Sequence, residues 1–298
     1  ALVLLAIFPL VMREMGLAIQ ILIFGLFALS FNLLFGYTGL LSFGHATLFG
    51  LGAYSTALAL IHMKFDLWLG LLSGVAVAAA SAFIIGFFCL RRREVYFAML
   101  TLAFGQMVFF IFFQAAGITG GDDGLRGVPI PRLEVPGLLS TKIDPMVNPF
   151  GFYYFALALL FLSMLALQRI VDSPFGRALQ AIRESEERAR ACGYDTNRLQ
   201  HLSFVFAGVF AGLAGALNAI NLGFVGLDSL HWMTSGVVVM MSILGGRRTF
   251  FGPLVGAGIY LFIEHYVSKY TDSWQLVVGA IFVLCVLALP EGSWGMAM

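Results

Sequence analysis

Few side chains in this sequence have the types and spacing that chemistry at an active site requires. The five histidines, and the cysteines Cys89, Cys192 and Cys285, are too scattered for a metal site or a disulfide framework. Glu264 and His265 are adjacent titratable residues in an apolar run, but nearby tyrosines and a lysine favour a membrane interface over a proton relay. The chain also lacks the G-x-x-x-x-G-K-[ST] phosphate loop. These features argue against an enzyme and against an ion-coupled carrier, which would need acidic groups inside the membrane.

The composition predicts an integral membrane protein. Of the 298 residues, 60% are hydrophobic and 11% are charged, whereas soluble domains carry roughly 25% charged residues. Apolar runs recur near 1–12, 16–36, 38–62, 67–90, 95–117, 150–168, 201–222, 232–245, 251–267 and 274–290. Continuous runs favour helices over the alternating strands of a barrel. We expect an all-α bundle of about 8–10 transmembrane segments in a single domain, residues 1–298. A net charge of +1 gives no basic face for nucleic acid.

The arginines predict how the chain is oriented. They cluster at 91–93, within 171–200 and at 247–248, and the positive-inside rule places such clusters on the cytoplasmic side. The loop 118–149 then lies on the extracytoplasmic side, where its prolines and acidic residues predict an irregular but ordered structure. The segment 172–198 is predicted to be cytoplasmic.

The segment 172–198 is the least hydrophobic part of the chain, and it carries the signals of a short helix. Ser173 can cap the helix with Pro174 in its first position, and Gly193 suits the position just past its end. Two i,i+4 ion pairs are expected on this helix, Glu184 with Arg188 and Glu186 with Arg190, each worth about 0.2–0.5 kcal/mol.

The same helix is predicted to be amphipathic. Its apolar stripe consists of Phe175, Ala178, Leu179 and Ile182. Such a helix suits the groove of a cytoplasmic partner, and it equally suits the surface of the lipid bilayer. The spacing does not choose between the two.

Glycines between residues 36 and 52 weaken the continuity of the third apolar run. Transporters place substrate sites at interrupted helices near the middle of the bilayer. Asn32, Ser42 and His45, with Gly44 at the bend, would then face a cavity. The alternative for His45 is a structural hydrogen bond within the bend, because polar residues inside membranes commonly pair within the helix bundle.

A second glycine-rich turn, Thr119-Gly120-Gly121, is expected at the outer mouth of the bundle. Its glycines allow positive φ, so that backbone donors can converge there as a gate or a docking lip. A plain solvated turn fits the same residues equally well.

Four stretches together resemble a known family, the branched-chain amino acid ABC transporter permeases, and in particular their M-type subunit. These are GLLSFGHATLFGLGAY at 39–54, TGGDDGL at 119–125, GRALQAIRE at 176–184 and LGGRRTFFGPLVGA at 244–257. They follow the family's order, and the matches run from about residue 30 to the C-terminus. One departure is Arg248 before Thr249, where the family often has a glycine, and this affects only the local turn.

The resemblance implies a multi-pass permease in the bacterial inner membrane that forms half of a translocation pathway. It implies an H-type permease partner, two cytoplasmic ATPase subunits and an extracytoplasmic substrate-binding protein, besides membrane lipid. ATP and magnesium would bind the ATPase subunits, and this chain would need no cofactor. Similar permeases import urea, short amides or aromatic acids, so the cargo stays open.

Two groups of site residues follow. The expected ATPase-coupling residues are Phe175, Gly176, Arg177, Leu179, Ile182, Arg183 and Glu184. The expected translocation residues are Asn32, Ser42, Gly44, His45, Thr119, Gly120 and Gly121.

Overall fold

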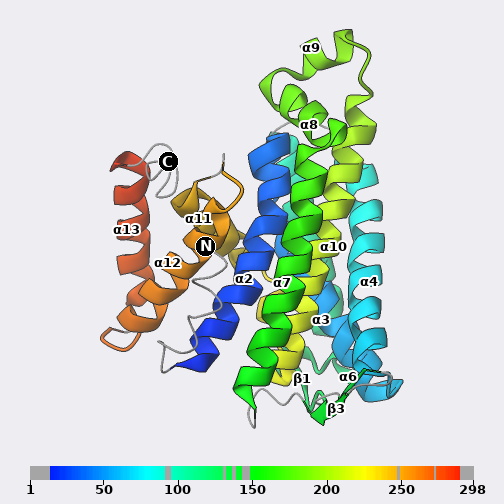
Figure 1. The fold of residues 1–298 in the computed structure, drawn as a ribbon, viewed down its shortest axis with the longest axis vertical. Coiled ribbons are helices and arrows are strands. Elements are labelled where there is room, and N and C mark those ends of the chain that lie inside the picture. The colour runs from blue at the N-terminus through cyan, green and yellow to red at the C-terminus, as the bar shows by residue number, and fades with distance from the viewer. Residues whose placement is uncertain are drawn as a thin grey trace.

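A computed structural model describes residues 14–90, 95–129, 132–135, 139–142, 148–246, 249–271 and 273–288. The first apolar run, 1–12, and the arginine clusters 91–93 and 247–248 lie outside these residues. The described chain is mainly helical, and its long helices run side by side as a bundle (Figure 1). The prediction of an all-α membrane architecture is confirmed.

Five helices of the described residues are long and apolar enough to cross a membrane. They are α2 (Met15–Asn32), which continues as the π-helix η1 (Leu33–Thr38), α4 (Leu67–Cys89), α5 (Val95–Gln114), α7 (Pro149–Asp172) and α10 (Thr196–Leu222). At about 1.5 Å per residue, the shortest of them already spans roughly the 30 Å of a hydrocarbon core. Each corresponds to a predicted apolar run.

Shorter apolar helices complete the bundle. They are α3 (His45–His62), α11 (Trp232–Gly245), α12 (Gly252–Val267) and α13 (Trp274–Ala288). The first of these starts well inside the apolar run 38–62, because Gly39 adopts a φ of 82° and ends η1. The interruption expected from the glycines is therefore confirmed, and it lies at residues 39–44.

Small residues let α3, α4 and α10 pack closely. A Cβ at Gly215 of α10 would overlap the carbonyl oxygen of Phe49 on α3, and a Cβ at Gly212 would overlap Ala78 on α4. Ala53 and Ala211 are fully buried in the same contact. Close approach through glycine and alanine is how membrane helices gain packing energy where lipid is as apolar as the side chains.

The predicted loop 118–149 is more regular than expected. It follows the short helix α6 (Ala116–Thr119) and holds η2 (Gly121–Asp123) and three strands. β1 (Leu125–Arg126) pairs antiparallel with β4 (Phe224–Val225), which precedes η3 (Leu227–Ser229), and β2 (Arg132–Val135) pairs with β3 (Leu139–Lys142). Strands β1 and β3 lie at one end of the bundle, whereas α8 (Pro174–Glu184) and α9 (Glu186–Ala191), from the segment 172–198, lie at the other (Figure 1).

The close contact at Gly215 can be tested by Gly215→Ala. The added methyl has to push α3 and α10 apart, and such overpacking costs about 1–3 kcal/mol. We expect a lower melting temperature in detergent than for the wild type. Gly279→Ala is the matched control, because a Cβ at Gly279 meets nothing within 4 Å. Equal melting temperatures for the two variants would contradict the packing described here.

Candidate coupling and translocation site

The segment between α7 and α10 forms two helices, α8 (Pro174–Glu184) and α9 (Glu186–Ala191). The predicted cap is confirmed, since Ser173 Oγ accepts the Gly176 N–H at 3.4 Å and Pro174 opens the helix. The prediction of one continuous helix is wrong. Ser185 takes an extended conformation and its Oγ accepts the Arg188 N–H at 3.3 Å, so it caps a second helix.

The break changes the predicted ion pairs. Glu186 and Arg190 lie on the same helix and form the expected pair at 2.7 Å. Thr196 joins them, with its Oγ1 at 3.0 Å from Arg190 and 3.3 Å from Glu186, which ties α9 to the start of α10. Glu184 and Arg188 lie on different helices, so the helical spacing on which their predicted pairing depended is lost.

The apolar stripe of α8 faces the chain's own bundle. Leu179 is 0% exposed and Ile182 is 4% exposed, while the ring of Phe175 packs edge-on against Phe206 of α10 at 5.8 Å. Gly176 is also buried, because α8 passes too close to the Val171 carbonyl for a Cβ. Leu179 and Ile182 are therefore covered by the bundle itself, whereas Phe175 is only partly buried, and the role of these residues in ATPase coupling stays a prediction.

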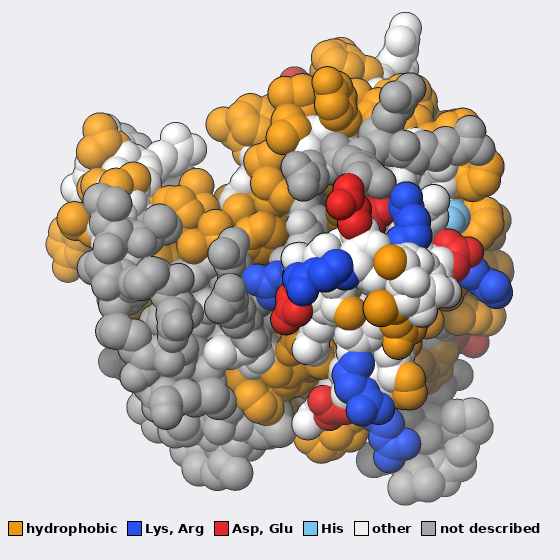
Figure 2. All heavy atoms as spheres, turned by 90° about the horizontal axis from the view of Figure 1, so that it is seen from above, with side chains coloured by type: hydrophobic (Ala, Val, Ile, Leu, Met, Phe, Trp, Pro, Cys, Tyr) orange, Lys and Arg blue, Asp and Glu red, His pale blue; other side chains and the backbone are white. Residues whose placement is uncertain are grey.

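The opposite face of α8 is open to solvent. Arg177, Gln180 and Glu184 are exposed there. Seen from this end, Figure 2 shows acidic and basic side chains gathered on the surface, with hydrophobic side chains beside them. A face of mixed charge can bind a protein partner through ion pairs and charge-assisted hydrogen bonds.

Arg183 differs from the exposed charges of α8. It is half-buried, and its guanidinium donates a hydrogen bond to the Gly36 carbonyl oxygen in η1. Its side chain also lies against Gly39, where an added Cβ would be 3.0 Å from the Arg183 Cγ. Arg183 therefore joins α8 to η1, the continuation of α2.

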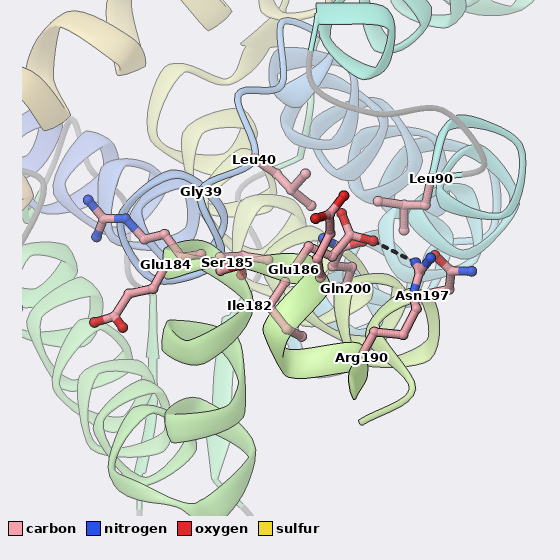
Figure 3. Close-up of a pocket in the computed structure, with 13 residues that line it drawn as sticks. Gly39, Leu40, Leu90, Ile182, Glu184, Ser185, Glu186, Arg190, Asn197 and Gln200 are labelled. Carbon is pink, nitrogen blue, oxygen red and sulfur yellow. Dashed lines mark hydrogen bonds and ion pairs between the residues drawn. The ribbon is translucent and has the colours of Figure 1, made fainter. Parts of the chain in front are cut away.

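A pocket of about 510 Å³ lies beside this contact (Figure 3). Its walls come from η1 and the following residues, the end of α4 at Leu90, the corner between α8 and α9, and the start of α10. Figure 3 shows the Glu186 carboxylate inside it, next to Arg190 and Asn197. Its walls carry charged and amide groups, and no group of three or more metal-ligating side chains occurs in the described parts of the chain.

The interrupted segment brings a helix start into the middle of the bundle. α3 begins at His45, whose Nε2 lies 2.9 Å from Ser30 Oγ on α2. The Ala46 N–H donates to Ser235 Oγ of α11 at 2.8 Å. Gly44, the residue before α3, packs against the Thr101 carbonyl so closely that a Cβ would not fit. The N-terminus of α3 therefore lies inside the protein, where it contacts the second turn of α11.

The structure encloses the predicted cavity residues of this segment. Asn32, Ser42 and His45 are 1%, 0% and 0% exposed, so the expectation that they face an open cavity is wrong. His45 stacks on Phe27 with ring centroids 5.2 Å apart, and Asn32 Nδ2 donates to the Thr249 carbonyl at 3.2 Å. The geometry favours the structural alternative for His45, since its neighbours α2 and α11 cover it.

The turn at 119–121 is ordered by its own side chain. Thr119 is 4% exposed, its Oγ1 donates to the Phe112 carbonyl at 2.6 Å, and it accepts the Gly121 N–H at 3.3 Å. Gly120 and Gly121 have φ values of 76° and 55°, as their expected role requires. This turn lies with β1 at the end of the bundle opposite α8.

Sequence reasoning did not assign a pathway role to polar residues on α5 and α11. Gln106 is only partly buried in the middle of α5. His231 and Thr234 are half-exposed at the start of α11, where the His231 ring lies 5.3 Å from Phe109. A Cβ at Gly236 meets nothing within 4 Å. The contact between His231 and Phe109 joins residues that are distant in the chain, so a single apolar run gives no signal for it.

Glu264 and His265 lie near the end of α12, and their placement at a membrane interface stays a prediction. His265 Nε2 lies 3.0 Å from a carboxylate oxygen of Glu14, and Lys269 Nζ lies 3.1 Å from the other. The hydrogen bond and charge of Lys269 hold the pKa of the Glu14 carboxyl below its ordinary value. These contacts join α12 to the start of α2 outside the apolar spans.

Long apolar helices packed through small residues, with a charged cap at one end, define this protein as a multi-pass α-helical membrane protein. Residues 15–287 match the family described as "Branched-chain amino acid transport system / permease component". The chain belongs to this family, and it is therefore a permease component of a transport system rather than an enzyme.

Curated relatives agree with this assignment. The high-affinity branched-chain amino acid transport system permease protein LivM of Escherichia coli (strain K12) is 30% identical, over 91% of this chain and 67% of that protein. The LivM protein of Salmonella typhimurium is 29% identical, over 94% of this chain and 69% of its own length. The LivH permease of the same organism is 25% identical, over 91% of both chains. No solved structure matches.

The structural role of His45 predicts a stability effect. His45→Ala removes a buried ring and its hydrogen bond to Ser30, and truncating a large buried side chain costs about 2–5 kcal/mol. We expect a lower melting temperature and less folded protein in the membrane. His62→Ala is the control, because His62 is an exposed histidine on the same helix. An unchanged melting temperature with an altered KM for uptake would instead assign His45 to the pathway.

Proposed function

We propose that this chain is the M-type permease subunit of an ATP-driven importer for branched-chain or related neutral amino acids. The observation that carries the proposal is the family match over residues 15–287, together with LivM relatives that align with 91–94% of the chain. The exposed charged face of α8 supports it, because a subunit without a phosphate loop needs a surface through which ATP hydrolysis elsewhere can act.

The proposed assembly places a partner on each exposed region. Two cytoplasmic ATPase subunits, which bind ATP and magnesium, lie beneath the permease pair, one of them against the outer face of α8. An extracytoplasmic binding protein docks at the opposite end, near Thr119, Gly120 and Gly121. The second permease, of the H type, completes the pathway in the bacterial inner membrane. This chain itself holds no cofactor.

The wall formed by α5 and α11 is the proposed lining of the pathway. Polar side chains that face lipid are costly, so the partly exposed His231 and Thr234 are better placed toward the second permease and the substrate. The start of α11 adds the positive end of a helix dipole, which suits the carboxylate of a neutral amino acid. The residues that hold the start of α3 in place then shape the pathway indirectly. They are Asn32, Ser42, Gly44 and His45.

Uptake into vesicles tests the proposal. Inside-out membrane vesicles are unsuitable for import, so the complete transporter is reconstituted in liposomes with ATP enclosed and the binding protein outside. We expect leucine uptake that stops when the enclosed ATP is depleted and continues when an ionophore collapses the ion gradients. Uptake that survives ATP depletion but is lost with the ionophore would contradict the proposal and indicate a secondary carrier.

The docking face is tested by Arg177→Glu. Losing one charge-assisted hydrogen bond removes about 1.5–3 kcal/mol, which weakens attachment of the ATPase subunits by about tenfold or more. We expect less ATPase to co-purify with the permease. Arg126→Glu, an equal charge reversal at the opposite end of the bundle, serves as the control. Wild-type recovery of ATPase with Arg177→Glu would place the docking surface elsewhere.

A further inference from the structure

We propose that Arg183 is a positioning residue that transmits movement of α8 to η1, and through it to the buried start of α3. This inference rests on the proposed function and adds a route for the motion. Its basis is the hydrogen bond from the Arg183 guanidinium to the Gly36 carbonyl, which links the charged end of the protein to the interrupted helix.

The other end of α8 is firmly attached to α7. Ser173 Oγ donates to the Ile170 carbonyl at 2.6 Å, and Gly176 lies against Val171 with no room for a Cβ. The buried residues Leu179 and Ile182 hold the middle of the helix against the bundle. A force on the exposed face of α8 therefore reaches α7 at one end and, through Arg183, η1 at the other.

η1 is the point where this movement can enter the bundle. It is a π-helical turn, a geometry that is rare and often found at functional sites. Thr38 joins it to α10, since its Oγ1 lies 2.8 Å from Ser203 Oγ. Residues 39–44 then lead directly to His45, which is held to Ser30 on α2. A shift of η1 is thus passed to the N-terminus of α3, where it meets α11.

The surroundings of Arg183 leave space for such a shift. The pocket of about 510 Å³ lies between η1, α8 and the start of α10, and Gly39 and Ile182 form part of its wall (Figure 3). The α8–η1 contact therefore has tight packing on one side and open volume on the other. An element packed on all sides could not move without breaking the core.

An arginine at position 183 is well suited to a rigid hydrogen bond with the neutral Gly36 carbonyl. Its guanidinium stays charged and presents several donors in one plane, whereas lysine has a single flexible ammonium. Gly39 allows the close approach, because its φ of 82° and its distance from the Arg183 Cγ both disfavour a side chain. The contact between α8 and η1 can therefore be disturbed from either side, by changing Arg183 or Gly39.

The test compares variants of the complete transporter in liposomes. Three quantities are measured: ATPase subunits recovered with the permease, ATP hydrolysis with and without loaded binding protein, and leucine uptake. For Arg183→Gln we expect recovery within about twofold of the wild type, but a loss of about tenfold in stimulated hydrolysis and uptake, the effect of one charge-assisted hydrogen bond. Arg183→Lys, which keeps a charged donor, should lie between Arg183→Gln and the wild type.

Two further variants, Gly39→Ala and Arg177→Gln, separate a loss of transmission through Arg183 from a loss of ATPase attachment. Gly39→Ala disturbs the contact from the η1 side, so it should reproduce the pattern of Arg183→Gln, and it decides the matter if Arg183→Gln does not fold. Arg177→Gln should instead lower ATPase recovery. The inference is overturned if Arg183→Gln loses ATPase recovery like Arg177→Gln, or if both Arg183→Gln and Gly39→Ala retain full stimulation. Failure of the proposed function is distinct, because it would appear as ATP-independent uptake by the wild type.

Discussion

The structure depends on pairing the backbone of a helix that starts inside the membrane. The first N–H groups of α3 must be paired by the protein itself, because an unpaired backbone group in an apolar interior is costly. Ser235 accepts the Ala46 N–H, and the Gly44 carbonyl accepts the Thr47 N–H at 3.1 Å. Gly44 itself fits only because it has no side chain. These contacts stabilise an interruption that would otherwise be excluded from the hydrocarbon region.

The interruption at residues 39–44 joins two parts of the protein that differ in how tightly they are packed. On one side, α3, α4 and α10 pack through glycine and alanine into a compact group with little room for adjustment. On the other, η1 buries Leu33 and Leu34 in the core, and its end makes polar contacts with α8 and α10 beside an open pocket. Residues 33–44 connect these two parts, and under the proposed coupling route they carry the movement from the charged end of the protein to its interior.

Local patterns in the sequence predicted most elements but few of their contacts. The apolar runs within the described residues, the Ser173 cap and the glycine interruption are encoded by neighbouring residues, and the structure confirms them. The break at Ser185 was missed because a serine inside a charged stretch fits both a helix interior and a new cap. The burial of Leu179, the His45–Ser30 bond and the β1–β4 pairing were not predictable, since each depends on residues distant in the chain or on the shape of the bundle.

The central claim is that α8 and α9 form the cytoplasmic face on which the ATPase acts, and Cys192 tests it directly. Cys192 is exposed just after α9, whereas Cys89 is buried. In a Cys285→Ser background, a membrane-impermeant maleimide should label Cys192 in inside-out vesicles, more slowly when the ATPase subunits are bound, and leave it unlabelled in right-side-out vesicles. Rapid labelling from the outside would contradict the orientation and the route of force that follows from it.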